Sequence, residues 1–298
     1  MSLSQVSGVM KEIQDNLRLH LTETMPQYLQ MALDHLFDRK PMNTKDRTFI
    51  EAIKADPTDL KQLESYADWL TDHMYEIDHA EEVYNYALLV APTSGHLKYR
   101  RAELLSEVRG RHAEAELAYR AALLLDPAHC GALVGYGRLL LDVFDDVAGA
   151  SARLDCAVRA HPGRVEALSE RARAYEAAGD TAAAERTYRL ALRAGPGDAQ
   201  ALNNYAGLLI QLDRAGEALE TLMRGVRSSG RAAAVVYNYG MALERMGETE
   251  RAEQAYREVL EKGGERIMDA MPTFAMAMRC SKRRAWRWVI TDMAHCHR

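Results

Sequence analysis

Four residues in the first third of the chain have the types and spacing of a metal site. His73, Glu76, His79 and Glu82 recur every three residues in the stretch HMYEIDHAEE. Imidazole and carboxylate groups are good ligands for divalent transition metals. The same residues also suit a solvated turn between two helices. We favour the turn, and we therefore expect no metal at this position.

Motifs for catalysis are missing from the sequence. It contains neither a G-x-x-x-x-G-K-[ST] phosphate loop nor an H-E-x-x-H zinc motif. Gly131, Gly135 and Gly137 form a loose glycine cluster, but no strand precedes them, which argues against a dinucleotide fingerprint. No Ser, His and Asp set can be assembled. We therefore expect a protein that is not an enzyme, with no catalytic residue, no small-molecule substrate and no cofactor.

The composition is that of an ordinary folded protein. Of the 298 residues, 48% are hydrophobic and 27% are charged, and the net charge is -5. This charge gives no reason to expect a nucleic-acid partner. The balance is uneven, because residues 265–298 hold seven Lys and Arg against three Asp and Glu. A basic tail therefore follows an acidic body.

Cysteine usage and the apolar pattern bear on the compartment. The four cysteines are scattered and form no C-x-x-C pair, which suggests free thiols in a reducing compartment. The first residues lack the apolar core of a secretory signal, and no run of about 18 apolar residues occurs. We expect a cytoplasmic location.

A thirteen-residue frame recurs along the chain. AEEVYNYALLVAP, AELAYRAALLLDP and AERTYRLALRAGP share the form A-E-x-x-Y-x-x-A-L-x-x-x-P. Its apolar spacing predicts an amphipathic helix, which the closing proline cannot continue. The first alanine of the frame, called here the marker alanine, returns every 34 or 35 residues. The marker alanines are Ala80, Ala115, Ala150, Ala184, Ala218 and Ala252.

Another predicted helix precedes each copy of the frame, as in LVGYGRLLLDV and LNNYAGLLIQL. Each of these helices carries a small residue at its middle, including Gly137, Ala172, Ala206 and Gly240. Glycine inside a helix costs about 0.5–1 kcal/mol relative to alanine, so its presence needs a reason. We expect the backbone of a neighbouring helix to pass close by, with the marker alanine facing it.

Two such helices in a 34-residue unit resemble the tetratricopeptide repeat. The signature positions are well filled in the fifth unit, by Leu202, Tyr205, Ala206, Leu209, Ala218 and Leu222. One departure is an extra residue between the helices of the first three units. The resemblance implies an all-α fold, a right-handed superhelical solenoid of about six helix-turn-helix units plus terminal helices.

The repeats predict three parts of the chain. Residues 1–58 form an N-terminal helical cap with a degenerate half-repeat, whose helix is RTFIEAIKADP. Residues 59–264 hold the six repeats. Residues 265–298 form a basic C-terminal capping helix or tail, since the end of a repeat array needs a cover.

The resemblance also implies where a ligand binds, because the first helix of each unit lines a concave groove in this family. Asn204 and Asn238 take the same place in successive units, similar to the asparagine ladder of some peptide-binding members. An amide offers both donor and acceptor to a peptide backbone. Two such bonds supply at most about 3 kcal/mol, whereas a micromolar complex needs about 8. Other candidates on this face are Arg100, Arg138, Arg173, Tyr237, Met241 and Arg245.

Acidic residues such as Glu103 and Glu107 share the predicted groove, which indicates a mixed-charge ligand. We expect a scaffold that binds an extended peptide or a partner helix. Two alternatives remain open at this point. The chain could be the regulatory or substrate-recruiting arm of an enzyme complex such as a glycosyltransferase. It could also act on membranes or RNA through its tail, SKRRAWRWVITDM, whose basic and tryptophan residues suit an interface.

Overall fold

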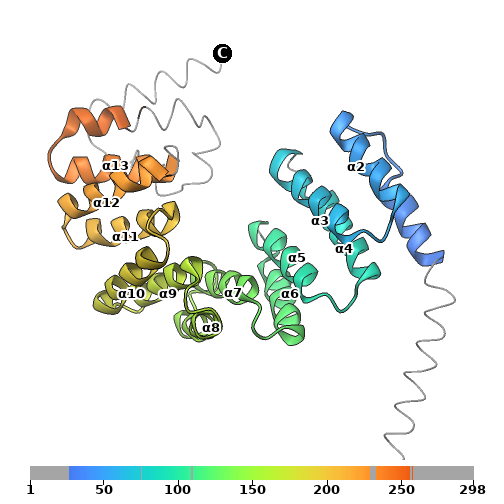
Figure 1. The fold of residues 1–298 in the computed structure, drawn as a ribbon, viewed down its shortest axis with the longest axis horizontal. Coiled ribbons are helices and arrows are strands. Elements are labelled where there is room, and N and C mark those ends of the chain that lie inside the picture. The colour runs from blue at the N-terminus through green and yellow to red at the C-terminus, as the bar shows by residue number, and fades with distance from the viewer. Residues whose placement is uncertain (1–26, 75, 109, 229–232, 256, 258–298) are drawn as a thin grey trace, which may run out of the picture. The chain divides into compact units, whose positions relative to one another are not determined.

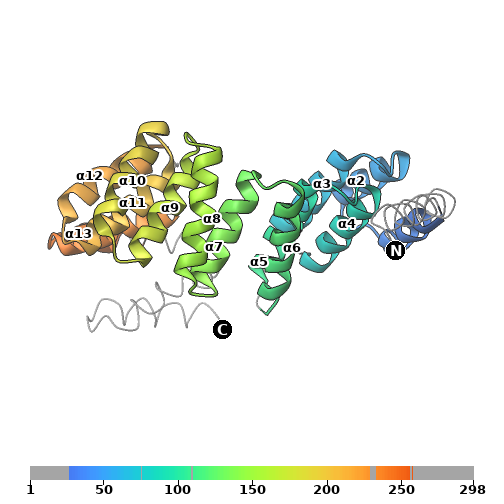
Figure 2. The same cartoon turned by 90° about the horizontal axis from the view of Figure 1, so that it is seen from below.

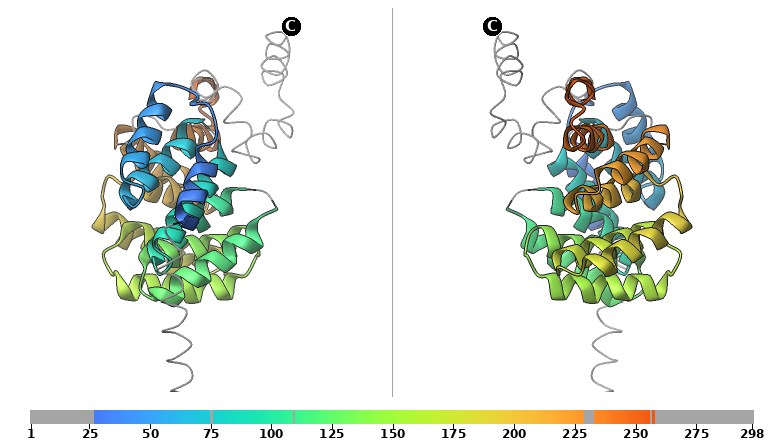
Figure 3. Two further views of the ribbon diagram at one scale, coloured as in Figure 1. Left: turned by 90° about the vertical axis from the view of Figure 1, so that its right-hand side faces the viewer. Right: turned by 90° about the vertical axis from the view of Figure 1, so that its left-hand side faces the viewer.

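The computed structural model describes residues 27–74, 76–108, 110–228, 233–255 and 257. Every regular element among these residues is a helix, as the two end views in Figure 3 show. The chain divides into two compact units, residues 1–160 and residues 161–298. No described helix is long and apolar enough to cross a membrane.

The first unit consists of helix pairs that follow one another along the chain (Figure 1). Residues 27–36 of this unit are helical. The helices that follow are α2 (Thr44–Ala55), α3 (Leu60–Trp69), α4 (Ile77–Val90), α5 (Gly95–Glu107), α6 (His112–Leu125), α7 (Cys130–Asp142) and α8 (Val147–Ala160). The most extensive packing joins α3 to α4, α5 to α6 and α7 to α8.

The second unit repeats this arrangement (Figure 2). Its helices are α9 (Val165–Ala177), α10 (Thr181–Ala194), α11 (Ala199–Gln211), α12 (Ala215–Ser228) and α13 (Ala233–Arg245), followed by helical residues 249–255. Here α9 packs on α10, and α11 packs on α12. The all-α repeat fold predicted from the sequence is therefore confirmed. The helix predicted in RTFIEAIKADP is α2, whereas the C-terminal part, residues 265–298, lies outside the described residues.

The frame residues do what their spacing predicts. All six marker alanines are buried, with at most 2% of their surface exposed. The frame tyrosines Tyr84, Tyr119 and Tyr188 are also buried, at 2% exposed or less. Helices α4, α6, α8 and α10 each end two residues before a proline. Proline cannot donate the next helical hydrogen bond, so it fixes where each helix stops.

Capping side chains fix the start of the first helix in four of the repeats, namely α3, α5, α7 and α11. Asp59, Ser94, His129 and Asp198 each accept a hydrogen bond from a backbone N–H in the first turn of the helix that follows. Such caps satisfy donors that have no partner within the helix. In these four repeats, a capping residue in the sequence therefore determines where the first helix begins.

The glycines of α7 make room for side chains, which corrects the expectation of a close helix backbone. A Cβ atom on Gly137 would lie 2.7 Å from the Cγ of Leu154. One on Gly135 would lie 2.6 Å from the hydroxyl of Tyr119, and one on Gly131 would lie 2.6 Å from the ring of Tyr99. The glycine cluster is thus explained by packing.

The extra residue of the first three repeats lies between their two helices, as the sequence predicted. In the second and third repeats this residue lengthens the loop, which spans residues 108–111 and 143–146, compared with residues 178–180 in the fourth repeat. In the first repeat, α3 continues into a π-helical turn, η1 (Leu70–Met74). Single π-helical turns accommodate an added residue and are frequent at functional sites.

Candidate functional site

A pocket of about 200 Å³ opens within the unit of residues 1–160, where the first helices of three successive repeats, α3, α5 and α7, contribute to its lining. Its lining comes from α3 with η1 and from α5. Arg138 of α7 and Tyr84 of α4 complete it. Its lining residues are Asp68, Thr71, Asp72, Tyr84, Arg100, Glu103, Leu104, Ser106, Glu107 and Arg138. Two of the predicted ligand-binding residues, Arg100 and Arg138, therefore share one cavity, together with the acidic Glu103 and Glu107.

The repeat register explains how these side chains come together. Asp68, Glu103 and Arg138 follow one another at intervals of 35 residues, each directly after the small mid-helix residue of its first helix. Asp72 and Glu107 come four residues after Asp68 and Glu103, one helical turn further on. Residues four apart lie on the same face of a helix. Stacked helices thus present two rows of charged side chains to one pocket.

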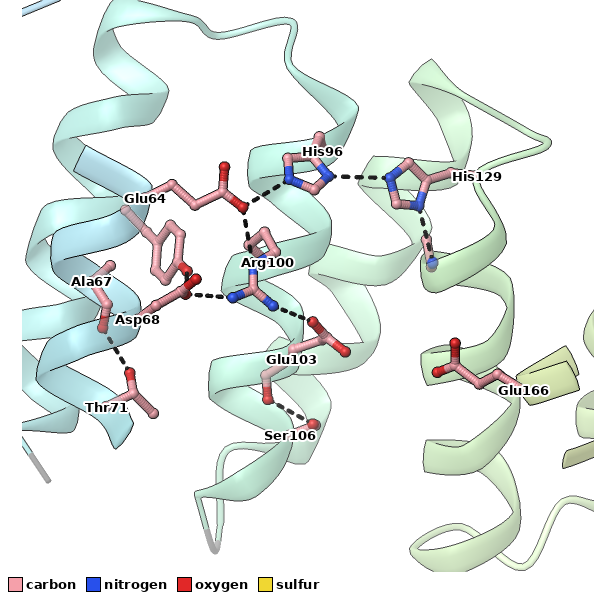
Figure 4. Close-up of polar contacts among 12 residues, drawn as sticks. Glu64, Ala67, Asp68, Thr71, His96, Arg100, Glu103, Ser106, His129 and Glu166 are labelled. Carbon is pink, nitrogen blue, oxygen red and sulfur yellow. Dashed lines mark hydrogen bonds and ion pairs between the residues drawn. The ribbon is translucent and has the colours of Figure 1, made fainter. Parts of the chain in front are cut away.

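Arg100 is already paired with carboxylates (Figure 4). Its guanidinium lies 3.2 Å from Glu64, 2.7 Å from Glu103, and in hydrogen-bond contact with Asp68. Asp68 also accepts a 2.7 Å hydrogen bond from the hydroxyl of Tyr84. Burial, together with this bond to Asp68, raises the pKa of Tyr84 far above its usual value. Arg100 therefore organises one wall of the pocket.

The opposite end of the pocket is less well neutralised. Arg138 is half-buried and forms no hydrogen bond or ion pair within the described part of the chain. Partial burial of the carboxyl group and the negative charges of Glu103 and Asp72 raise the pKa of Glu107, against the opposing effect of Arg138. Among the described residues, Asp72 and Glu107 thus have no ion-pair partner, and the cations that act on Glu107 are Arg138 and the already paired Arg100.

A pair of histidines borders the same helices. The Nε2 atom of His96 lies 2.8 Å from Glu64, and its Nδ1 atom lies 3.4 Å from the Nε2 of His129 (Figure 4). The Nδ1 atom of His129 accepts from the backbone N–H of Ala132 and so caps α7. Burial and the neighbouring His96 lower the pKa of His129. This chain of contacts links α3, α5 and α7 at the N-terminal ends of α5 and α7.

The predicted asparagine ladder lies in the second unit, and its amides are already engaged. The amide of Asn238 donates to the side-chain oxygen of Asn203 at 2.9 Å. The side-chain nitrogen of Asn204 lies 3.5 Å from the hydroxyl of Ser169, and its side-chain oxygen accepts a hydrogen bond from Gln200 at 2.9 Å. Each ladder residue therefore contacts the preceding first helix or its own. Both are half-buried, so an amide N–H of each is left for a ligand.

The remaining predicted residues of the second unit have different environments. Arg173 pairs with Glu170 at 2.7 Å, and Arg245 donates to the carbonyl of Ile210 at 3.3 Å. Tyr237 is half-buried, and burial raises its pKa. Met241 packs against the hydrophobic core of the unit. Met241 is thus chiefly a packing residue in this structure.

The His and Glu cluster near η1 is arranged differently from the solvated turn that the sequence favoured. His79 lies in α4, and only 11% of its side chain is exposed. Its Nε2 atom lies 3.2 Å from the hydroxyl of Tyr66 and 3.1 Å from the Nε of Arg39. Among the described residues, no group of three His, Cys, Asp or Glu is placed to hold a metal ion. His79 is part of a buried network instead.

Six lining residues were not identified from the sequence as part of a site: Asp68, Thr71, Asp72, Tyr84, Leu104 and Ser106. The signal for the two aspartates was present, since they stand 35 residues before Glu103 and Glu107. The signal for Tyr84 was hidden, because its ring fills a core position while its hydroxyl reaches Asp68.

Comparison with known proteins adds to this picture. Residues 164–290 match the family model described as Tetratricopeptide repeat. This match runs beyond residue 264, where the sequence predicted the last repeat to end. No curated protein matches the chain.

Several solved structures share the fold. A tetratricopeptide repeat protein from Parabacteroides merdae ATCC 43184 has a TM-score of 0.62 at 18% identity, over 84% of this chain and 99% of that one. PilW, a type IV pilus biogenesis factor, has a TM-score of 0.58 at 17% identity, over 68% and 93%. A thermophilic tetratricopeptide repeat protein from Thermus thermophilus has a TM-score of 0.55 at 19% identity, over 62% and 98%. At these identities the likeness concerns the fold alone.

Proposed function

We propose that this chain, a member of the tetratricopeptide repeat family, is an interaction scaffold that binds an extended peptide against its first helices. The fold itself supports binding to other proteins in general. The more specific proposal concerns where the peptide binds. It is supported above all by the pocket of the first unit, to which three successive repeats contribute side chains.

The shape of this pocket suits one residue of a longer ligand. A volume of about 200 Å³ is below that of usual small-molecule sites, which span roughly 300–1,000 Å³. It lies on the helices that the family uses to bind peptides. A single side chain of a peptide would fill it, while the remainder of the peptide contacts neighbouring helices.

Asn204 and Asn238 supply a second contact region, in the other unit. Their remaining N–H groups suit the carbonyl groups of a peptide backbone, whatever its sequence. Each hydrogen bond contributes about 0.5–1.5 kcal/mol, so the ladder alone gives weak binding. We propose that it forms a separate, weaker contact region for a partner.

We further propose that the protein acts in the cytoplasm and has no catalytic activity of its own. The scattered cysteines support a reducing compartment, and the absence of catalytic motifs in the sequence supports a binding role. Cell fractionation with an antibody against the native chain tests the location. Recovery in a periplasmic or membrane fraction would contradict it.

Affinity capture from cell lysate with the full-length chain tests the binding proposal. Three proteins are compared by quantitative mass spectrometry: the unchanged chain, the pocket variant Asp72→Asn/Glu107→Gln, and the ladder variant Asn204→Ala/Asn238→Ala. We expect the pocket variant to lose the main partner and the ladder variant to retain part of it. A partner retained in full by both variants would mean that these helices do not form the binding surface.

A further inference from the structure

We infer that the pocket of the first unit receives one basic side chain, Lys or Arg, of the bound peptide. This inference rests on the proposed function and adds the chemical class of the ligand. Both cations carry N–H donors only and no acceptor. They therefore suit a cavity in which carboxylates outnumber cations.

The charges in the pocket favour a cation. Its lining includes Asp68, Asp72, Glu103 and Glu107 against Arg100 and Arg138, an excess of two negative charges. Arg100 is shared among Glu64, Asp68 and Glu103. Of the cations that line the pocket, only Arg138 then remains for Asp72 and Glu107. An anionic side chain would meet four carboxylates, whereas a cation would complete the pairing.

The backbone places Asp72 at this site. Asp72 belongs to η1, where the backbone N–H of Glu76 bonds to the carbonyl of Leu70 at 3.2 Å. The hydroxyl of Thr71 donates to the carbonyl of Ala67 at 3.0 Å. These bonds hold the turn in a shape that brings both Thr71 and Asp72 to the pocket lining. The backbone at Asp72 is thus fixed next to the pocket, and its exposed carboxylate is accessible to a ligand.

A buried polar group beside the pocket also lacks a partner. Tyr119 is 0% exposed, and its hydroxyl has no hydrogen-bond partner among the residues that the structure describes. Burial raises the pKa of this hydroxyl to about 12, and the pocket-lining residues Ser106, Glu103 and Arg138 have smaller effects on it. The equivalent Tyr84, one repeat earlier, reaches the pocket and bonds to Asp68. Tyr84 therefore adds a polar group to the pocket lining, whereas Tyr119 is fully buried and does not line the pocket.

Binding of a cation here is linked to protons. Because the pKa of Glu107 is raised, part of its population is protonated at mildly acidic pH. A bound cation favours the ionised form, so affinity rises with pH through the pKa of Glu107 and falls below it. Affinity also falls with added salt, because Asp72 and Glu107 are exposed to solvent.

Selection from a library of random twelve-residue peptides, displayed on phage, tests the inference with the full-length chain. We expect the selected peptides to share Lys or Arg at one aligned position. The tightest of them is then made with norleucine or glutamate at that position. Norleucine should weaken binding roughly tenfold, and glutamate more, as measured by calorimetry.

Variants of the chain complete the design. Asp72→Asn/Glu107→Gln should weaken the Lys peptide roughly tenfold and leave the norleucine peptide unchanged. The matched control Asp38→Asn/Glu51→Gln removes two exposed acids of the same unit outside the pocket, and should retain binding. Circular dichroism confirms that each variant is folded.

The outcomes separate the two proposals. If peptides are selected without a common basic residue, or if norleucine binds as well as lysine, peptide binding stands and the basic side-chain inference is wrong. If no peptide is selected at all, both proposals fail. If a selected peptide resembles residues 281–293 of this chain, the occupant is the chain's own basic segment, and the side-chain chemistry still holds.

Discussion

Glu81 and Arg111 form the same ion pair that Glu185 and Arg214 form three repeats later. In both, a guanidinium nitrogen lies 3.0 Å from the carboxylate. The Glu directly follows a marker alanine, and the Arg stands directly before the second helix of the next repeat. Each Arg also holds the Glu three residues after it, Glu114 or Glu217. The glutamate of the repeated frame therefore joins one repeat to the next.

The Glu81 pair can be tested by neutralising each acid. Glu81 is 9% exposed and accepts from both Arg101 and Arg111. Glu81→Gln should lower the free energy of unfolding by about 2 kcal/mol, because hydrogen bonds to charged groups are lost and two arginines keep no common partner. Urea unfolding followed by circular dichroism measures this. Glu114→Gln, on the exposed side of Arg111, is the control and should leave the midpoint nearly unchanged; equal effects would contradict the role of Glu81.

The packing of Gly135 gives a second prediction. A Cβ atom there would lie 2.6 Å from the hydroxyl of Tyr119, which is fully buried and cannot move aside. Gly135→Ala should therefore destabilise the protein by about 1–3 kcal/mol. Gly207→Ala is the matched control, because nothing lies within 4 Å of its added carbon. It should stabilise the protein by about 0.5–1 kcal/mol through helix propensity. Thermal melts that rank the two variants in the opposite order would refute this account.

The network around His79 predicts a dependence of stability on pH. Burial and the positive charge of Arg39 lower the pKa of His79, while Glu82 opposes them. The unfolded chain then binds a proton that the folded chain does not, below the ordinary histidine pKa of about 6.5. Stability should therefore fall as the pH drops from about 7.5 to about 5.5. His79→Gln should reduce this slope, and the capping residue His129 accounts for part of what remains.

Asp46 titrates in a different range. Burial works against its ionised form, but hydrogen bonds from Met42, Tyr66 and Arg39 outweigh burial and lower the pKa of Asp46 below its usual value of 3.8. Its contribution is present above that value and is lost only as the pH falls through the lowered pKa. If stability depends on pH across the mildly acidic range equally in His79→Gln and in the unchanged chain, His79 is not the source of that dependence.

The ladder gives a fourth prediction, because its contacts separate packing from binding. The side-chain oxygen of Asn203 accepts a hydrogen bond from the amide nitrogen of Asn238 at 2.9 Å. Asn203→Ala removes this bond but leaves the Asn238 amide available, so peptide affinity should stay equal or rise. Asn238→Ala removes the amide itself and should weaken binding by about 0.5–1.5 kcal/mol. Calorimetry with one selected peptide compares them. Equal losses in both variants would mean that the pair acts only through packing.

The sequence by itself determined the repeat and the ends of the helices. The marker alanines predicted which face of each second helix is buried, and the prolines predicted where α4, α6, α8 and α10 end. These features are local, since the apolar period, the caps and the helix breakers act within a few residues along the chain. Arg100, Arg138, Glu103 and Glu107 were also identified as sharing one face.

Only the tertiary structure decided which charges are paired with which. Arg100 and Arg138 read alike in the sequence, but Arg100 lies among three carboxylates, while Arg138 has no ion pair with any described residue. Likewise, His79 reads as part of a solvated turn but is largely buried, and its imidazole contacts the hydroxyl of Tyr66. The physical reason is that ion pairs and burial depend on distances between side chains a whole repeat apart. Periodicity fixes the face on which a residue lies, whereas the stacking of repeats fixes its partner.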